Sequence, residues 1–448
     1  MLSAVALCLA MARVGAAPEE QYARKPASDV PTFSKDVAPI LFKNCAGCHR
    51  PGEIGPMPLL SYEDARPWAK AMRDEVSEGN MPPWHADPSH GVFANDRSLP
   101  AGDRETIVRW ANGGAPKGDP ADLPPLPKFT DGWSIGEPDL VVTMPEPYEV
   151  PADGFVEYEY IEIPIDIKED RWIRAMEVRP GNRAVVHHVI VYARPPQPER
   201  RPAGFRLAPD MGIPVGASGG PEEPEGRKRP RGLSRFPPPR RLGVSIGGYA
   251  PGHRTQGFDP GSAMLLRAGS TLVLQMHYTP NGEAQTDQTK VGFFFATEPP
   301  KTELRFASLL NGNFAIPAGA TSHEVKAEMT ALADVTLRQL LPHTHLRGKS
   351  WEYTAIYPDG RSEVILSVPR YDFNWQTDYV FAQPLKLPKG TTIRAVAHYD
   401  NSAANKSNPD PTVDVKWGDQ TWEEMMFTAF VYSIDGVAPG TVIPTTPR

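Results

Sequence analysis

The sequence predicts a multidomain protein in which a small α-helical domain precedes two antiparallel, jelly-roll-like β-sandwich domains. Three observations lead to this prediction. The chain of 448 residues is too long for one compact core. Apolar residues recur at helical spacing in the first part of the chain, whereas beyond residue 135 they alternate with period two. Proline (51 residues) and glycine (38 residues) are abundant, which favours short strands joined by turns.

The N-terminal segment resembles a secretory signal peptide, because an apolar run is followed by small residues. We expect residues 1–17 to be removed and the mature protein to be periplasmic or secreted. A buried N-terminal helix is the alternative. Cys8 would be lost with the signal peptide, which leaves Cys45 and Cys48 as the cysteines of the mature chain. Two cysteines in one short motif exclude a disulfide framework.

The charge of the chain limits its partners. A formal net charge of -7 argues against nucleic-acid binding, which depends on positive groups that neutralise phosphates.

After the N-terminus no stretch is apolar over the ~20 residues that a membrane span needs. We therefore expect no nucleic-acid partner and no membrane span after signal cleavage.

Three helices are predicted in the first domain, over residues 33–44, 62–77 and 101–113. In each segment apolar residues recur at helical spacing. The segment Pro116–Lys128 is rich in proline and polar residues, as a linker is. The first domain is therefore placed at residues 28–128, about 100 residues, which is a normal size for a small domain.

Cys45-Ala-Gly-Cys48-His49 has the C-x-x-C-H spacing of a covalent c-type haem site. Two thiols add across the haem vinyl groups, and the adjacent His49 is then held beneath the iron as an axial ligand. A zinc site would need two more Cys or His ligands at matching spacing. A helix before the motif and a Trp-bearing helix after it make residues 28–128 resemble a class I cytochrome c domain.

The second axial ligand of this haem is predicted to be Met81, which lies in Met81-Pro-Pro-Trp84. A methionine thioether raises the reduction potential and suits electron transfer. A methionine followed by two prolines also resembles the ligand loop of such cytochromes. Met57 is an alternative that lies nearer the motif, and His85 and His90 are weaker ones.

The remaining chain is predicted to form two sandwiches, at residues 135–300 and 301–448, with a boundary near Glu298–Glu303. Ile161–Ile167 alternates strictly, as a half-buried strand does. Residues 194–262, rich in Pro, Gly and Arg, interrupt the first sandwich, and we expect a solvated loop rather than a docking element. The other expected strands are Ala184–Tyr192, Ser270–Tyr278, Val291–Ala296, Trp351–Tyr357, Thr392–His398 and Met425–Ser433.

Two histidine pairs are candidate metal ligands. His187 and His188 are neighbours in an apolar strand, so both reach one ion only at a bulge or a strand end. Otherwise one is a core residue and the other a surface residue. His343 and His345 are two residues apart, and on a strand such residues share a face.

Two further residues extend these pairs. His277 lies in a third apolar strand with Gln275 on the same face, and Met425 offers a soft sulfur. Imidazole together with thioether selects copper, especially Cu(I), over zinc or magnesium.

The motif order is His-His, Gln-x-His-Tyr, His-Thr-His-Leu and Glu-Met. Over residues 135–435 this order resembles the copper type II, ascorbate-dependent monooxygenases, a family that includes peptidylglycine α-hydroxylating monooxygenase and dopamine β-hydroxylase. The resemblance implies two copper ions, with Gln275 supporting His277. The implied ligands are His187, His188 and His277 for an electron-transfer copper, and His343, His345 and Met425 for an oxygen-binding copper.

The sequence departs from this family at several points. Animal relatives are rich in disulfides, which this chain lacks. Leu341 stands where the peptide enzyme has an Arg that binds the peptide carboxylate, and Ala429 replaces a Tyr. Peptide α-amidation is therefore not expected. His398 has no ligand counterpart in the family, so we expect it to be structural.

The expected function is a copper- and O2-dependent monooxygenase that hydroxylates a C–H bond of an unknown small molecule. An external donor, either a small reductant or a redox protein, would reduce the haem. Electrons would then pass to the first copper and on to the second. One alternative is a non-catalytic electron-transfer cytochrome with a copper- or ligand-binding β module. Another reverses the flow, so that the haem exports electrons from an oxidised substrate.

Overall fold

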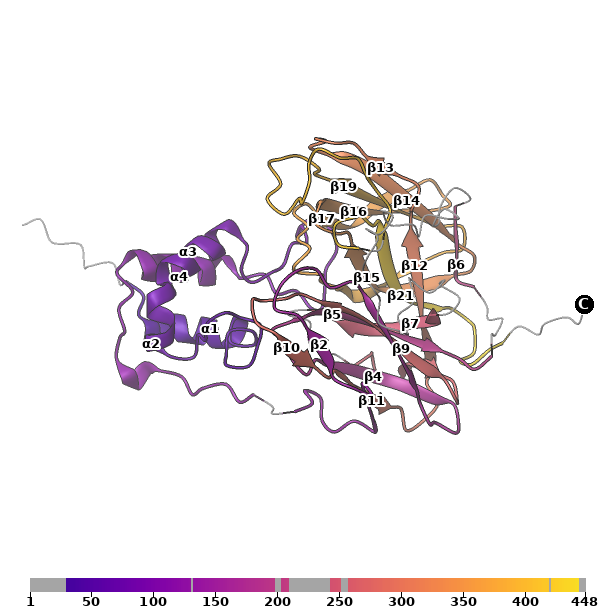
Figure 1. Ribbon diagram of the computed structural model, residues 1–448, viewed down its shortest axis with the longest axis horizontal. Helices are drawn as coiled ribbons and strands as arrows, with labels where there is room; N and C mark the ends of the chain where they lie inside the picture. The colour runs from indigo at the N-terminus through magenta and orange to yellow at the C-terminus, as the bar shows by residue number, and fades with distance from the viewer. Residues whose placement is uncertain are drawn as a thin grey trace, which may run out of the picture.

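The computed structural model describes residues 30–129, 132–197, 203–208, 242–250, 257–418 and 420–442. Its helices gather at one end of the molecule, and β-sheets form the rest (Figure 1). The predicted signal peptide, residues 1–17, lies outside the described residues. Within the described ranges, no helix is long and apolar enough to cross a membrane.

The helical domain packs around a small apolar core. Leu41, Ile107 and Trp110 are buried in this core. The three expected helical segments are present, but the second is divided, because Pro67 lacks the amide proton that a continuous helix requires. The helices are η1 (Phe33–Val37), α1 (Ala38–Asn44), α2 (Tyr62–Ala65), η2 (Arg66–Trp68), α3 (Ala69–Glu78), α4 (Ala101–Asn112) and η3 (Pro120–Asp122).

The strands follow in two groups along the chain. The first group is β1 (Leu140–Thr143), β2 (Tyr148–Val150), β3 (Glu159–Pro164), β4 (Arg171–Arg179), β5 (Val186–Arg194), β6 (Phe205–Leu207), β7 (Val244–Tyr249), β8 (Ser262–Leu266), β9 (Thr271–Tyr278), β10 (Gln285–Asp287) and β11 (Lys290–Phe295). The second group is β12 (Thr302–Leu310), β13 (Ala315–Ile316), β14 (His323–Ala331), β15 (Val335–His343), β16 (Gly348–Ile356), β17 (Ser362–Val368), β18 (Tyr379–Leu387), β19 (Thr392–Tyr399), β20 (Val415–Lys416) and β21 (Phe427–Ile434).

These strands build two sandwiches that share one sheet. The shared sheet has eight strands in the order β1-β11-β4-β8-β12-β21-β15-β18. Sheet β3-β9-β5-β7 covers its first half and sheet β17-β16-β19-β14-β6 covers its second half, each with an apolar core between the layers. The described strand pairs are antiparallel except for β8 and β12, which pair in parallel where the halves meet. The β-sandwich class that the sequence predicts therefore fits the structure.

The insertion at residues 194–262 contributes strands to both sandwiches. β6 pairs with β14 of the second sandwich, and β7 pairs with β5 of the first. The expectation of a solvated loop is therefore wrong for these parts, whose period-two pattern is too short to stand out in the sequence. Residues 209–241 of this insertion lie outside the described residues.

The segment Trp84–Arg97, which we call the strap, leaves the helices and packs on the second sandwich. Trp84 and Phe93 belong to the core of that sandwich, and the Trp84 ring lies 5.0 Å from the Tyr379 ring. The Ala94 amide donates to the Val380 carbonyl at 2.7 Å. Residues 28–128 are therefore not self-contained.

Candidate metal centre

A β-bulge brings three histidines of the first sandwich together. His188 of β5 lies directly opposite His277 of β9, and the register shifts between Val186 and His188. His187 is thus the extra residue of the bulge, which is the condition under which neighbouring histidines can reach one ion. One ligand atom from each of the three histidines lies within 4.8 Å of the others.

The spacing of these nitrogen atoms fits one metal ion. The Nδ1 atom of His188 lies 3.2 Å from that of His187 and 3.4 Å from that of His277. Three nitrogens bound at the usual metal–nitrogen distance of about 2.0 Å lie about 3.3–3.5 Å apart. The Nε2 atom of His277 contacts the Thr421 hydroxyl at 3.3 Å, and donation to that hydroxyl leaves the Nδ1 lone pair for a metal.

Burial keeps these imidazoles neutral. Desolvation, together with the His343 imidazole, lowers the pKa of His187 to about 4. Desolvation and the neighbouring imidazoles hold the pKa values of His188 and His277 well below the usual histidine value. The neutral imidazole is the form that binds metals, so the set is ready to bind at neutral pH.

The second histidine pair lies at a strand end. His343 is the last residue of β15, and His345 lies in the following turn, with 5.2 Å between their ring centroids. The expectation that both lie on one strand is therefore wrong, although their rings converge. His343 Nδ1 lies 2.8 Å from Gln376 Oε1, and His345 Nδ1 lies 3.3 Å from the Glu423 carbonyl.

These contacts define which nitrogen of each ring is available. Both acceptors require a proton on Nδ1, so the Nε2 lone pairs of His343 and His345 are left to bind a metal. The Nε2 atom of His345 is buried and has no hydrogen-bond partner in the described part of the chain. A metal ion would satisfy this atom.

Glu424 is a residue of the site that sequence reasoning missed. Its buried carboxylate accepts hydrogen bonds from the backbone amides of His345 at 2.9 Å, Arg347 at 2.7 Å and Met425 at 3.1 Å. Burial raises the pKa of Glu424 to about 7, against the opposing effect of these bonds. This side chain therefore joins the turn that carries His345 to the segment that carries Met425.

Met425 precedes β21 rather than lying in it. The side chains nevertheless alternate between two faces from Met425 onward. Met425, Phe427 and Ala429 line a cavity of about 420 Å³, whereas Met426 and Phe430 lie in the core of the second sandwich. The cavity lies between the sandwiches. His188 and His343 also line it, so Met425 and both histidine sets share one cavity.

The two histidine sets adjoin across the boundary between the sandwiches. The ring centroids of His188 and His343 are 6.2 Å apart. The Phe373 ring stacks on His187 at 4.9 Å and lies 6.1 Å from the His345 ring. Five imidazoles from two sandwiches therefore form one continuous cluster.

Gln275 and His398 form hydrogen bonds with residues outside the two histidine sets. Gln275 is buried on β9, donates to the Tyr160 hydroxyl at 2.5 Å and lines the cavity. His398 contacts the Ser350 hydroxyl at 3.2 Å and Glu324 at 3.7 Å, away from the histidine cluster.

The Cys-x-x-Cys-His motif forms a compact turn after α1. The amides of Cys48 and His49 donate to the Cys45 carbonyl at 3.0 Å and 2.9 Å. Neither cysteine forms a disulfide, and burial raises the pKa of the Cys45 thiol to about 12. His49 Nδ1 lies 3.2 Å from the Met57 carbonyl, which leaves Nε2 as its ligand atom. These features fit covalent haem attachment.

The candidates for the second axial ligand lie on other segments. Met81 follows α3, is half-buried, and its amide donates to the Glu75 carbonyl at 3.3 Å. Met57 packs against the helical core. His85 and His90 lie on the strap. Met81 stays the predicted ligand.

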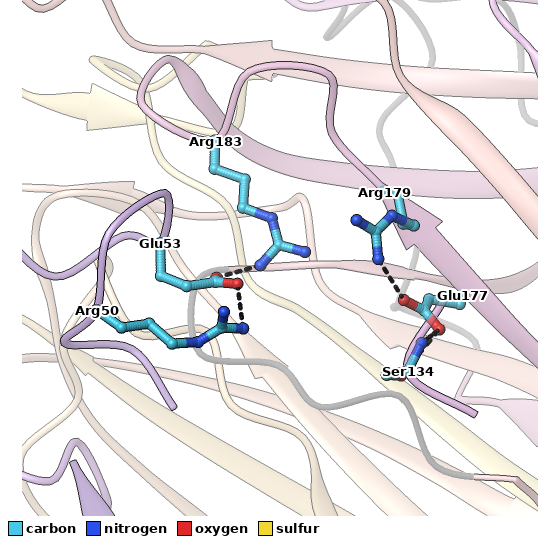
Figure 2. A network of polar contacts seen from close by, with 6 residues as sticks. All are labelled: Arg50, Glu53, Ser134, Glu177, Arg179 and Arg183. Atoms are coloured by element: carbon cyan, nitrogen blue, oxygen red, sulfur yellow. Dashed lines mark hydrogen bonds and ion pairs between the residues drawn. The ribbon is translucent and has the colours of Figure 1, made fainter. Parts of the chain in front are cut away.

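The segment that follows the Cys-x-x-Cys-His turn contacts the first sandwich just before β5. Figure 2 shows the Glu53 carboxylate between Arg50, at 2.7 Å, and Arg183, which lies just before β5. Tyr249 of β7 pairs with Val189, the residue after His188. Burial raises the pKa of Tyr249 to about 12, and the nearby Glu53 and Cys48 add to this effect.

A second polar contact in Figure 2 fixes the chain where it enters the first sandwich. Glu177 of β4 accepts from the amide and hydroxyl of Ser134 at 2.8 Å and pairs with Arg179 at 3.6 Å. The chain is thus held at β4 just after the linker.

Comparisons with known proteins identify no family. No family model and no curated protein matches the sequence. Among solved structures, a protein from Eubacterium rectale is 9% identical, with 62% of this chain and 69% of that chain covered and a TM-score of 0.18. PBCV-1 VP54, fitted into a reconstruction of the virophage Sputnik, is 10% identical, with 71% and 100% covered and a TM-score of 0.25. Such low TM-scores describe different chain paths and carry no functional conclusion.

Proposed function

We propose that this chain is a copper- and O2-dependent monooxygenase that hydroxylates a C–H bond of a small molecule, with electrons supplied through a c-type haem. The observation that carries the proposal is the meeting of two histidine sets at one cavity between the sandwiches. When bound, the copper ions would supply electrons to O2, and the haem would supply one-electron transfer from an external donor.

The chain's own residues have distinct roles in this proposal. His187, His188 and His277 would hold one copper through three nitrogens. His343 and His345 would hold the other together with the Met425 sulfur, a soft ligand that favours Cu(I). Thr421 and Gln376 orient one imidazole in each set, as supporting groups around metal ligands do.

The contact between the helical domain and the first sandwich supports the proposal that the haem passes electrons to the copper of the first histidine set. The Glu53–Arg183 ion pair joins the segment after the Cys-x-x-Cys-His turn to the residues just before β5, the strand that carries His188. Tyr249 of β7 lines the cavity and pairs with Val189, the residue after His188. Cys45, Cys48 and His49 would hold the haem, with Met81 as the predicted second ligand.

Copper stoichiometry tests the metal sites. We expect two coppers per chain in the wild type and one in His343→Ala, because one of the two available Nε2 ligands of the second set is removed. His398→Ala is the matched control and should keep two. A wild type that binds no copper, or binds copper that is inert to O2 when reduced, would favour the alternative of an electron carrier with a β module.

Electron supply through the haem is tested by substitution rather than by deletion, because deleting residues 28–128 would remove Trp84 and Phe93 from the core of the second sandwich. The double variant Cys45→Ser/Cys48→Ser should bind no covalent haem. We expect it to lose turnover with a reduced redox protein but to keep turnover with ascorbate. Equal activity of variant and wild type with both donors would show that the haem is not the relay.

A further inference from the structure

The cavity at the histidine cluster has a wall without formal charge. It lies between β5 and β7 of the first sandwich and β12, β15 and β21 of the second. Its volume of about 420 Å³ lies in the range of small-molecule sites. None of its described lining residues is Asp, Glu, Lys or Arg. Much of the wall is apolar, formed by residues such as Val189, Ile190, Leu242, Phe306, Leu310 and Phe427.

The wall next to His343 is apolar as well. Leu341 and Ala429 face each other across the β15–β21 pair, and both line the cavity. While no metal is bound, a carboxylate or an ammonium group placed beside them would lose its water without gaining an opposite charge from the described wall. Burying an unpaired charge is unfavourable, so this wall disfavours charged ligands.

One polar group of the wall has an unused hydrogen-bond donor. Gln376 is 8% exposed and lines the cavity. Its Oε1 atom contacts His343 Nδ1, whereas its Nε2 atom is buried and has no partner among the described residues. A buried donor without a partner is rare in native proteins, and a ligand oxygen would satisfy it.

We propose that the cavity binds a neutral, largely apolar molecule with an acceptor oxygen (a ketone, ether or alcohol) that receives a hydrogen bond from Gln376 Nε2. This inference rests on the proposed function, because it names the substrate class of the same site. The apolar wall holds the body of the molecule, and the amide of Gln376 orients it beside His343.

Three probes of equal ring size test the charge preference on copper-free, haem-bearing protein: cyclohexanone, cyclohexanecarboxylate and cyclohexylamine. Calorimetry or ligand-observed NMR gives the dissociation constants. We expect cyclohexanone to bind at least about tenfold more tightly than either ion, because each ion must lose the water around its charge when it enters the cavity. Tighter binding of an ion, equal binding of all three, or binding of none would overturn the inference.

Two variants locate the binding site. Leu341→Arg should reverse the order of cyclohexanone and cyclohexanecarboxylate, because it places a positive charge on the wall. Gln376→Met removes the donor at similar length and should weaken cyclohexanone binding up to about tenfold, while toluene binding stays unchanged. Cyclohexanone binding that is unaffected by Gln376→Met would refute the hydrogen bond. These binding measurements use copper-free protein, so they are independent of the copper stoichiometry. If the protein prefers the neutral probe but does not bind two coppers, the proposed function is wrong and this inference stands.

Discussion

The two histidine sets differ in how the chain builds them. In the first sandwich, two paired strands and one bulge bring three Nδ1 atoms together, with His188 in the middle. In the second, the candidate ligands come from a strand end, a turn and Met425, which lies two residues before the start of β21 at Phe427. Side chains from elsewhere, Gln376 and Glu424, hold these pieces in place.

This difference indicates a division of labour. The backbone hydrogen bonds of a sheet fix the first set, which suits a metal that changes charge without changing its ligands. The second set places two of its three candidate ligands, His343 and Met425, on the cavity wall, whereas the first set places only His188 there. An open coordination position is what a metal needs to bind a reactant. The variants below test whether the backbone alone positions the first set and whether the second set depends on side chains such as Gln376.

The largest effect is expected from His188→Ala, because its Nδ1 atom contacts those of both other histidines. Copper affinity of the first set should fall by more than about 100-fold. This is more than the loss expected when a residue that only hydrogen-bonds to a ligand is removed. The second set should keep its copper. Titration against a competing chelator measures both affinities. Loss of both coppers together would mean that the five imidazoles form one centre.

An intermediate effect is expected from Gln376→Leu, which removes the acceptor that orients His343. Copper affinity of the second set should fall by about 10- to 100-fold, and that of the first set should not change. The same chelator titration applies, with Gln339→Leu as a control on another glutamine of the cavity wall. An unchanged second set would show that the turn alone fixes the His343 ring.

The smallest effect is expected from Thr421→Val. The contact of Thr421 with His277 Nε2 is 3.3 Å, longer than the 2.8 Å contact of Gln376 with His343. The sheet register also holds His277 directly opposite His188. Copper affinity of the first set should therefore fall less than about tenfold. A loss as large as that of Gln376→Leu would contradict the idea that the backbone makes the first set self-sufficient.

Local sequence patterns predict which histidines are candidate ligands and most of the secondary structure. The helical segments at 33–44 and 101–113 follow from apolar spacing, and the bulge at His187 is the geometry that adjacent histidines require. The expectation that His343 and His345 share a strand was wrong, because the chain leaves β15 at His343 and the amides of His345 and Arg347 donate to the Glu424 carboxylate instead.

The supporting residues could not be predicted, because their partners are far away in the sequence. Gln376 lies 33 positions from His343, and Thr421 lies 144 positions from His277. A single sequence contains no pattern that separates Gln376 and Thr421 from glutamines and threonines that lie on the protein surface. Phe373, between the two sets, is likewise an ordinary aromatic residue in the sequence. The family resemblance, the haem and the coppers stay predictions.

The strap has a consequence for the order of folding. It is synthesised early, yet Asn95 finds its partner Asp378 across 283 positions of the chain. Contacts of such large sequence separation slow folding, since a long loop must close before they form. The contact between Trp84 of the strap and Tyr379 therefore forms only after the chain has been made as far as residue 379. The helical domain, which the strap joins to the second sandwich, reaches its final position no earlier than that.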